Sequence, residues 1–453
     1  MARPRKNAAK VQGSLLAPDE VAEIPVEEQP YPLPEGWKWE RGNSLWKPQE
    51  TEKPTGEFFY YIDIDAVDNK QQKVISPKKI PLSQAPSRAS RKLHEGDTIF
   101  SLVRPYLRNI AYIDEDISSC IASTGFYICS PLKSVNSRFL YWLMTSDYVV
   151  LGLNKFMKGD NSPSIRKNDI ENFPFPLPPI DEQQRIVDRI ESLFARLDEA
   201  KSKAEAVLDG FEIRKAAILH KAFTGELTER WREENKIQIS SWKEESITSL
   251  CHSLKYGTAK KSKEIGSTVV LRMGNLQDGE IDWSNLAYSD DQDDIQKYLL
   301  FPNDVLFNRT NSSELVGKTA IYRGEYPAIY AGYLIKMNYK KNRLTGSYLN
   351  YVMNSHKAKE YCNNVKSDGV NQSNINAKKL GAFVISVPSL PEQQEIVRIL
   401  DNLLAKERHI REAAENALSQ IDLMKKAILA RAFRGELGTH GSARDTLQNN
   451  GSM

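Results

Sequence analysis

The sequence predicts an α+β protein in which two α/β globules are separated by a pair of long antiparallel coiled-coil helices, with a pseudo-two-fold internal repeat. Three observations lead to this fold class. One long segment occurs twice, both copies carry a helical heptad pattern, and the region before each copy alternates short β-rich runs with Gly, Asn, Ser and Pro turns. The chain has 453 residues, a length that predicts two or three domains.

The repeat is the clearest of these features. Residues 182–227 reappear as residues 392–437, at an offset of 210 without a gap, and 19 of the 46 positions are identical. Each copy follows a proline-rich lead-in, and each ends in the pattern A-F-x-G-E-L. We infer that the chain arose by duplication of one unit.

Both copies have the apolar spacing of a coiled-coil helix. Apolar residues recur at alternating intervals of four and three from Ile186 to Phe211 in the first copy. In the second copy they do so from Ile396 to Ile428, with one interruption at Glu407. Such a heptad seam packs against another helix. We expect each copy to be a continuous helix of roughly 43 residues, a rod of about 65 Å.

The ends of the two helices carry matching signals. Ser389 and Glu392 fit a capping box, and Asp181 is a plausible N-cap for the first copy. Gly225 and Gly435 stand where the helices should end.

The regions before the helices, about 36–178 and 241–387, predict globules built on short strands such as DTIFSLV and DVLFNR. They align loosely with each other but have diverged more than the helices. Because helix 1 leads from globule 1 to globule 2, a second helix that packs on it must run antiparallel. The expected domains are a disordered tail (1–30), globule 1 (31–180), spacer helix 1 with a linker (181–235), globule 2 (236–390), spacer helix 2 (391–437) and a second disordered tail (438–453).

Composition excludes several classes of protein. No run approaches the ~18 apolar residues of a membrane helix, and the basic start lacks a signal-peptide core. The four cysteines form no C-x-x-C pair, which argues against a zinc ribbon and a secreted disulfide framework. We therefore expect a cytoplasmic location and neither a membrane partner nor a metal. The net charge of +3 is low for a nucleic-acid-binding chain, although each globule is mildly basic.

Catalytic motifs are missing. The sequence contains no G-x-G-x-x-G, H-E-x-x-H or G-x-S-x-G. Residues 316–319 resemble the end of a phosphate-binding loop, but Ser312 stands where its leading glycine belongs, so a strand-edge turn is the better interpretation. We expect no catalytic residue and no cofactor in this chain.

Basic, amide and aromatic residues gather in loops at corresponding places of both globules. Arg, Asn and Gln can hydrogen-bond to base edges, and Lys mostly contacts phosphate. Each cluster alone is more typical of a solvated loop, and the recurrence favours DNA contact. The first cluster, within 73–92, has the composition of a flexible loop. The candidate DNA-binding residues are Lys73, Lys78, Lys79, Arg88, Arg91, Lys92, Arg104, Tyr106, Arg108, Lys155, Lys158, Arg166, Lys167, Lys255, Tyr256, Lys260, Lys261, Arg272, Asn275, Arg309, Asn311, Lys366, Asn371, Gln372 and Asn374.

A second set of candidates lies at the helix ends, outside the heptad seam but repeated between the copies. Local capping and a docking surface present twice explain them equally well, and the second hypothesis implies two copies of one partner. These candidate partner-binding residues are Glu182, Gln183, Gln184, Phe223, Glu226, Leu227, Glu392, Gln393, Gln394, Phe433, Glu436 and Leu437.

These motifs resemble a known family. The L-P-x-G-W sequence at 33–37, the P-P-I-D-E-Q-Q-R-I lead into helix 1 and the twice-used A-F-x-G-E-L, first followed by T-E-R-W-R-E-E-N, are similar to the specificity subunits of Type I restriction–modification systems. The resemblance covers roughly residues 31–437 and implies a host-defence function. In that family each globule is a target-recognition domain for one half of a bipartite double-stranded DNA site, and the helices set the spacer.

The resemblance also implies partners. Two copies of a DNA adenine-methyltransferase subunit would bind the chain, and restriction subunits would join them. S-adenosylmethionine, ATP and Mg would be bound only by those partners. The chain departs from the family pattern in its first ~30 residues and after Leu437, where T-E-R-W-R-E-E-N is not repeated.

Two other classes of function stay open. A coiled-coil protein-interaction scaffold without DNA contact would share the heptads. An enzyme, such as part of a fused methyltransferase–nuclease, would require activity of the purified chain, and the missing motifs disfavour it.

Overall fold

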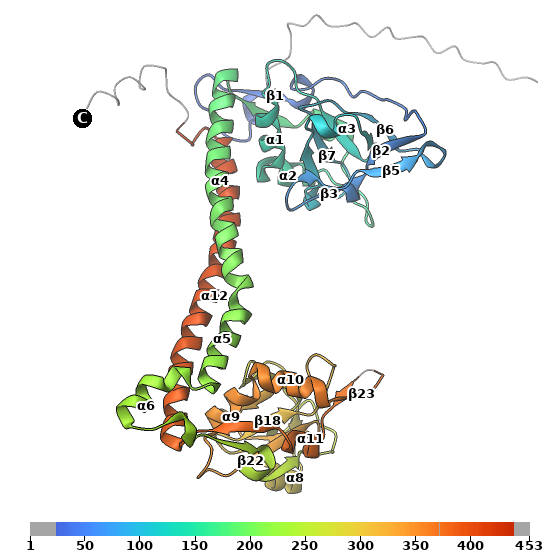
Figure 1. The fold of residues 1–453 in the computed structure, drawn as a ribbon. Coiled ribbons are helices and arrows are strands. Elements are labelled where there is room, and N and C mark those ends of the chain that lie inside the picture. Colours follow the sequence, from blue (N-terminus) through green and yellow to red (C-terminus); the bar gives the residue numbers. More distant parts are fainter. Residues whose placement is uncertain (1–23, 371, 439–453) are drawn as a thin grey trace, which may run out of the picture. The chain divides into compact units, whose positions relative to one another are not determined.

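The computed structural model describes residues 24–370 and 372–438 (Figure 1). The chain divides into two compact units. Unit 1 comprises the described residues up to Lys203 together with those from Ala417 onward, and unit 2 spans Ala204–Asn416. Both units are mixed α/β, and each contains segments of the long helices, so the mixed α/β class predicted from the sequence is confirmed.

Unit 1 is built on several small sheets. The first and last strands of its globule, β1 (Lys38–Arg41) and β11 (Pro174–Leu177), pair antiparallel. A four-stranded sheet has the order β5 (Lys78–Pro81), β2 (Phe58–Ile62), β9 (Ile121–Ser123), β6 (Ala89–Lys92). A three-stranded sheet has the order β10 (Phe126–Cys129), β7 (Thr98–Ser101), β8 (Ile110–Tyr112), and β3 (Val67–Asp68) pairs with β4 (Lys73–Val74).

The helices of unit 1 connect this globule to the long helices. They are α1 (Ser137–Thr145), α2 (Asp147–Asn154), α3 (Lys167–Glu171) and the first part of α4 (Ile180–Asp209) (Figure 1). One core cluster joins Phe139 of α1 and Phe175 of β11 to Ile186 of α4 and Phe433, which follows α12. Burial of these side chains fixes the long helices onto the globule.

Unit 2 repeats this plan. Strands β12 (Lys243–Ser246) and β25 (Val384–Val387) pair antiparallel, as β1 and β11 do. A four-stranded sheet has the order β13 (Cys251–Tyr256), β22 (Leu334–Tyr339), β18 (Val305–Asn308), β20 (Thr319–Ile321). A three-stranded sheet has the order β17 (Tyr288–Ser289), β14 (Thr268–Leu271), β21 (Ala328–Tyr330). Small sheets are β15 (Leu276–Gln277) with β16 (Glu280–Ile281), and β19 (Thr310–Asn311), β24 (Ser373–Asn374), β23 (Ser367–Asp368).

The helices of unit 2 are α5 (Phe211–Phe223), α6 (Glu229–Asn235), α7 (Ile247–Leu250), α8 (Gln292–Tyr298), α9 (Gly346–Met353), α10 (His356–Val365), α11 (Ala377–Gly381) and the first part of α12 (Leu390–Ala432). Their core cluster joins Leu219 of α5 and Tyr348 of α9 to Ile396 and Leu400 of α12. This cluster anchors the helices in the same manner as in unit 1.

Matching caps show that the units share their local structure. Asn136 caps α1 and Ser146 caps α2 by accepting hydrogen bonds from backbone N–H groups of the first turn. Thr345 and Ser355 do the same for α9 and α10. Such caps satisfy donors that the helix itself leaves free, which defines where each helix begins.

The second long helix is continuous, as the sequence predicts, and the first is not. Helix α12 runs for 43 residues, whereas α4 ends at Asp209 and α5 begins at Phe211. The interruption falls at Gly210, the residue type with the lowest helix propensity after proline.

The turn of 316–319 leads into β20 and has positive φ at Gly317, in agreement with a strand-edge turn.

Residues 24–30 differ from the disordered tail predicted for 1–30. Val26–Glu28 form a 3₁₀ turn, Ile24 is buried, and Arg41 forms an ion pair of 2.7 Å with Glu28. The remaining residues of that tail, 1–23, and residues 439–453 of the second tail lie outside the described part of the chain. In the residues that are described, no helix has the length and apolar character required to cross a membrane.

Candidate nucleic-acid interface

A short β-hairpin follows α2 in unit 1 and α10 in unit 2. Hairpin 1 is formed by residues 158–164, where Lys158 and Ser164 exchange two backbone hydrogen bonds of 3.0 Å. In hairpin 2, Ser367–Asp368 (β23) pair antiparallel with Ser373–Asn374 (β24). Each hairpin is fixed by the same contact: the N–H of Ile165 donates to the carbonyl of Leu102, and the N–H of Ile375 donates to that of Arg309, both at 2.9 Å.

Hairpin 2 lies beside a cluster of residues that could contact bases. Arg309 stacks over the ring of Tyr256 at 4.7 Å, and its Nη2 donates to Oδ1 of Asn374 at 3.2 Å. The Nδ2 of Asn374 donates to the hydroxyl of Thr310 at 2.8 Å. Within the described residues, the buried Nε of Arg309 has no hydrogen-bond partner. The fold thus joins candidates that are more than 100 residues apart in sequence.

Hairpin 1 joins the candidates around Arg104 to those within 155–167 in the same way. Arg104 donates its backbone N–H to the carbonyl of Pro163 at 2.8 Å and its Nη2 to the carbonyl of Asn161 at 2.7 Å. Arg104 has a left-handed backbone with φ of 47°, a conformation that is rare outside glycine. The adjacent Tyr106 is exposed.

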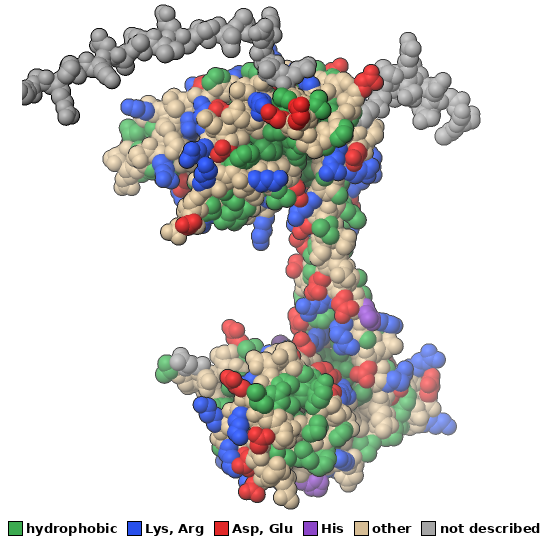
Figure 2. Space-filling model, turned by 180° about the vertical axis from the view of Figure 1, so that it is seen from behind, with side chains coloured by type: hydrophobic (Ala, Val, Ile, Leu, Met, Phe, Trp, Pro, Cys, Tyr) green, Lys and Arg blue, Asp and Glu red, His purple; other side chains and the backbone are tan. Residues whose placement is uncertain are grey.

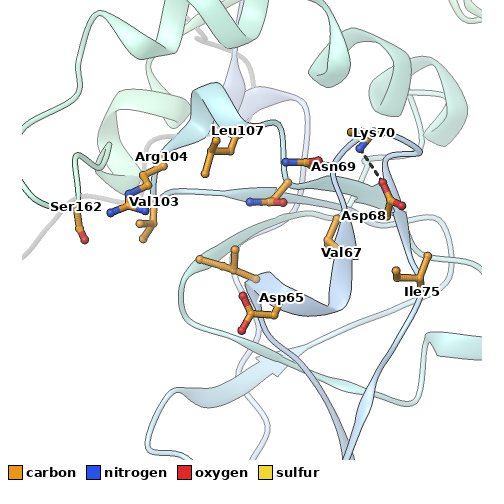
Figure 3. Close-up of a pocket in the computed structure, with 12 residues that line it drawn as sticks. Asp65, Val67, Asp68, Asn69, Lys70, Ile75, Val103, Arg104, Leu107 and Ser162 are labelled. Atoms are coloured by element: carbon orange, nitrogen blue, oxygen red, sulfur yellow. Dashed lines mark hydrogen bonds between the residues drawn. The ribbon is translucent and has the colours of Figure 1, made fainter. Parts of the chain in front are cut away.

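A cleft of about 640 Å³ opens beside Arg104 (Figure 3). Arg104 and Ser162 of hairpin 1 lie on one side, and Asp65 and Asp68 lie across from them. Asp68 accepts the N–H of Lys70 at 2.8 Å, which together with the N–H of Gln71 lowers the pKa of Asp68. The cleft therefore presents Arg104 on one side and two carboxylates together with Lys70 on the other.

The first cluster of unit 1 is not a flexible loop. Lys78 and Lys79 lie on β5 and Arg91 and Lys92 on β6, at opposite edges of the four-stranded sheet. Lys73 lies in the separate β3–β4 pair. The composition of 73–92 suggests a loop because its extended segments are short and polar. They form strands because β5 pairs with β2 and β6 pairs with β9.

Several predicted cations are neutralised within the chain. Lys78 pairs with Asp63 and Lys260 with Asp291, each at 2.6 Å, and these hydrogen bonds raise the pKa of both lysines. Arg108 forms an ion pair with Asp147 and donates to the carbonyl of Thr145.

Asn275 also has an internal role, which corrects its assignment as an exposed contact. It is buried, and its side chain accepts the N–H of Arg272 at 2.8 Å and donates to the carbonyl of Asp282 at 2.9 Å. Asn371 lies outside the described residues.

The other candidates remain at or near the surface. On the face drawn in Figure 2, Lys and Arg side chains form scattered groups mixed with Asp and Glu, without one continuous basic patch. Half-buried candidates are Arg91, Lys92, Arg272, Asn311 and Lys366. Exposed candidates are Lys73, Lys79, Arg88, Lys155, Lys158, Arg166, Lys167, Lys255, Lys261 and Gln372.

The repeated Glu-Gln-Gln motif holds each long helix onto its own globule. Gln183 accepts the N–H of Asn136 at 2.8 Å and donates to the carbonyl of Pro178 at 2.9 Å. Gln393 accepts the N–H of Thr345 at 2.9 Å and donates to the carbonyl of Pro388 at 3.0 Å. Both glutamines are fully buried, so they cannot form a docking surface in this fold.

The preceding glutamates make a second matched contact. Trp37 donates from Nε1 to Glu182 at 3.0 Å, and Trp242 donates to Glu392 at 2.9 Å. Glu392 also binds Arg232, which α6 supplies.

The phenylalanines of the helix-end motif pack inside the chain as well. Phe433 contacts Phe139, and Phe223 contacts Tyr348, at ring distances of 5.5 and 5.7 Å. Leu227 and Leu437 pack against the two cores. Of the predicted docking residues, Gln184, Glu226, Gln394 and Glu436 are exposed.

Each unit also has a groove between its globule and the long helices. Groove 1, of about 820 Å³, is lined by Phe194, Asp198 and Lys201 of α4 and by Lys425 and Leu429 of α12, among other residues. Groove 2, of about 390 Å³, is lined by the residues 210 positions away, namely Leu404, Arg408, Arg411, Lys215 and Leu219. The two grooves therefore lie at equivalent positions of the repeat, although their volumes differ and Arg408 stands where groove 1 has Asp198.

Sequence reasoning missed these grooves and the residues that shape them. Arg138 lines groove 1, pairs with Glu191 at 2.8 Å and stacks over Tyr112 at 4.7 Å. Burial raises the pKa of Tyr141, which also lines this groove, to about 12. The residues that the long helices contribute to the grooves do have a signal in the sequence, because charged residues recur at equivalent positions of the repeat, as Lys201 with Arg411 and Lys425 with Lys215.

Two α/β globules, each with a hairpin at the same strand end and a groove against the same long helices, define a protein built from one globule–helix unit used twice. The chain belongs to the family of the Type I restriction modification DNA specificity domain, whose profile matches residues 48–207 and 239–420. It is thus a specificity subunit, a non-catalytic component of a Type I restriction–modification system.

Similar proteins agree with this assignment. The EcoKI specificity subunit of Escherichia coli K12 is 27% identical over 315 residues, which cover 68% of each chain. The putative MjaX specificity subunit of Methanocaldococcus jannaschii is 30% identical over 48% of this chain and 52% of its own length.

Solved structures extend the likeness to the fold. A chain from a study of complex assembly and conformational transition of the type I R-M system has a TM-score of 0.74 and 27% identity, covering 90% of this chain and 100% of its own. The HsdS subunit of Thermoanaerobacter tengcongensis has a TM-score of 0.66 and 26% identity, covering 90% of this chain and 99% of its own.

Proposed function

We propose that the chain reads a bipartite sequence in double-stranded DNA, one half with each globule. The observation that carries this proposal is the placement of hairpins 1 and 2 at the same strand end in both units. Although the hairpins occupy equivalent positions, their polar neighbours differ: Arg104 and Asn161 in unit 1, Arg309 and Asn374 in unit 2. Equivalent placement with different hydrogen-bonding groups is what two different half-sites require.

The remaining candidate cations, including Lys155, Lys158, Lys255 and Lys261, would contact phosphates around these hairpins. The proposed target-recognition domains are residues 31–180 and 236–390, and the proposed spacer helices are 181–235 and 391–437. Such a chain acts in the cytoplasm, where the DNA of a bacterium or archaeon lies.

The two long helices would form an antiparallel coiled coil that sets the distance between the half-sites. Asp198 pairs with Lys425 within unit 1, and Arg214 pairs with Glu407 within unit 2. The paired residue on the first helix moves toward a higher residue number, from Asp198 to Arg214, while its partner on the second helix moves toward a lower one, from Lys425 to Glu407. This order supports an antiparallel pair. A pseudo-two-fold relation of the two units follows from this arrangement.

Grooves 1 and 2 would each receive one copy of a DNA adenine-methyltransferase subunit, and restriction subunits would join through these copies. The equivalent positions of the two grooves, in which Lys425 matches Lys215 and Leu429 matches Leu219 at an offset of 210, support two copies of one partner. The exposed Gln184, Glu226, Gln394 and Glu436 are candidates for further contacts. S-adenosylmethionine, ATP and Mg would be bound by these partners.

The experiment is methylome sequencing of a host that carries this chain and its methyltransferase subunit. We expect methylated adenines within one split motif with a fixed number of unspecified bases. Loss of the chain should abolish this methylation. A scaffold without DNA contact would leave the methylation sites unaltered when the chain is removed, and that result would refute the proposal.

A further inference from the structure

The interruption of the first long helix at Gly210 is bridged by one side chain. Arg214, one turn into α5, folds back so that its Nη2 donates to the carbonyl of Val207 at 3.0 Å. That carbonyl belongs to the last turn of α4, where helix carbonyls lose their partners. Arg214 therefore satisfies an acceptor that the interruption exposes.

Glycine accommodates this path as it stands. A Cβ atom at position 210 would lie 2.4 Å from Nη1 of Arg214, so the guanidinium end of that side chain would have to shift. The backbone of Gly210 has φ of −76°, which any residue can adopt, so the backbone conformation does not call for glycine. Gly210 and Arg214 thus form one structural device.

Helix α12 contacts Arg214 and the first residue of α5 from the opposite side. Glu407 accepts a hydrogen bond from Nε of Arg214 at 2.8 Å, and its side chain is only 13% exposed. One turn further along α12, Arg411 stacks over the ring of Phe211 at 5.2 Å. Contacts from α12 therefore fall on both the first and the fourth residue after the interruption.

The device occurs in one copy of the repeat only. The positions equivalent to Gly210, Arg214 and Glu407 are Gln420, Met424 and Leu197. Helix α12 is continuous through Gln420 and Met424. Glu407, which interrupts the apolar seam of the second copy, is thus explained by Arg214.

We infer that Gly210, Arg214 and Glu407 form a clamp that fixes the first helix at its interruption and makes the chain accept one spacer length. This inference rests on the proposed function of the helices as a spacer. An interrupted helix without the clamp could bend at position 210, and a bend would bring half-sites at other separations within reach. Arg214 and Glu407 are accordingly positioning residues, because they act on the spacer and not on DNA.

The test compares spacer selectivity in the complex of the full chain with its methyltransferase. Methylation rates are measured on the natural target and on targets with one base pair more or fewer between the half-sites. For Glu407→Gln we expect the preference for the natural spacer to fall by roughly tenfold, equivalent to about 1.4 kcal/mol. Glu199→Gln, which removes an exposed ion pair with Lys203 on α4, serves as the control and should keep full selectivity.

A second variant separates selectivity from folding. Arg214→Met with Glu407→Leu introduces the apolar residues of the other copy, and because this ion pair is only partly buried, replacing it by apolar groups that fit the seam should preserve stability. We expect an unchanged or higher melting temperature together with reduced spacer selectivity. Undiminished selectivity in both variants would overturn the clamp. A wild-type complex that methylates all spacers equally would instead refute the spacer function itself.

Discussion

Trp242 donates a hydrogen bond from its indole Nε1 to Oε2 of Glu392 over 2.9 Å, at the point where α12 begins. The other oxygen of this carboxylate accepts hydrogen bonds from Arg232 and Thr228, also at 2.9 Å. The side chain of Glu392 is completely buried. A buried carboxylate with three donors fixes the helix start, and Trp37 with Glu182 repeats the first of these contacts in unit 1.

Removing this carboxylate should destabilise unit 2 strongly. Glu392→Ala leaves the buried guanidinium of Arg232 without its counter-ion, and such changes cost about 3–5 kcal/mol. Trp242→Phe removes one of three donors to the carboxylate and should cost less, about 1.5–3 kcal/mol. Urea unfolding followed by circular dichroism measures both, and similar small losses in the two variants would contradict the role of the ion pair.

Arg309 and Asn374 should determine one half-site only. Arg309→Ala removes the group that joins Tyr256 to Asn374, and we expect a loss of about 1–3 kcal/mol in discrimination at one base pair of that half-site. Lys263→Ala, which removes a surface ion pair with Asp290 in the same unit, is the control. Methylation rates on a set of singly altered targets provide the measurement. Equal loss at both half-sites would count against separate reading by the two globules.

Each groove should hold one methyltransferase subunit. Lys425→Glu changes the charge of groove 1, and Arg408→Glu changes that of groove 2. Either variant alone should reduce the complex from two methyltransferase copies to one, and both together should abolish binding. Native mass spectrometry of the mixed subunits gives the stoichiometry. Two bound copies in the double variant would place docking elsewhere.

Stability should decline at alkaline pH because the buried thiols resist ionisation. Burial raises the pKa of Cys362 to about 11 and that of Cys251 to about 12, from an ordinary value of 9.0. The unfolded chain loses these protons first, so the stabilisation is present below pH 9 and is lost as pH rises toward 11, by up to about 1.4 kcal/mol per pH unit and thiol. Thermal unfolding between pH 7 and 11 measures the loss, and Cys362→Ala should make the decline shallower. A melting temperature independent of pH up to 11 would contradict this.

The long helices could be predicted because a repeat and a heptad pattern are properties of the sequence alone. The role of Gln183 and Gln393 could not, because their partners at Asn136 and Thr345 are nearly 50 residues away and the sequence suits a cap equally well. The same limit applies to hairpin 2, because the pairing of β19 with β24 brings Arg309 and Asn374 together from positions 65 residues apart.

The errors in the candidate site have local causes. Lys78 and Arg91 were grouped because they are close in sequence, but the order of the four-stranded sheet places them at opposite edges. The heptad pattern continues to Phe211 and therefore predicts no interruption at Gly210, and the hydrogen bond from Arg214 to Val207 that bridges it has no signal in the sequence.

The most direct test of the central claim is to exchange the second globule. Residues 236–390 are replaced by the corresponding globule of another specificity subunit with a different known target, and the methylome of the host is sequenced. We expect one half of the split motif to change to that of the donor, while the other half and the spacer length stay the same. A motif altered in both halves, or in neither, would contradict the account of two globules that each read one half-site.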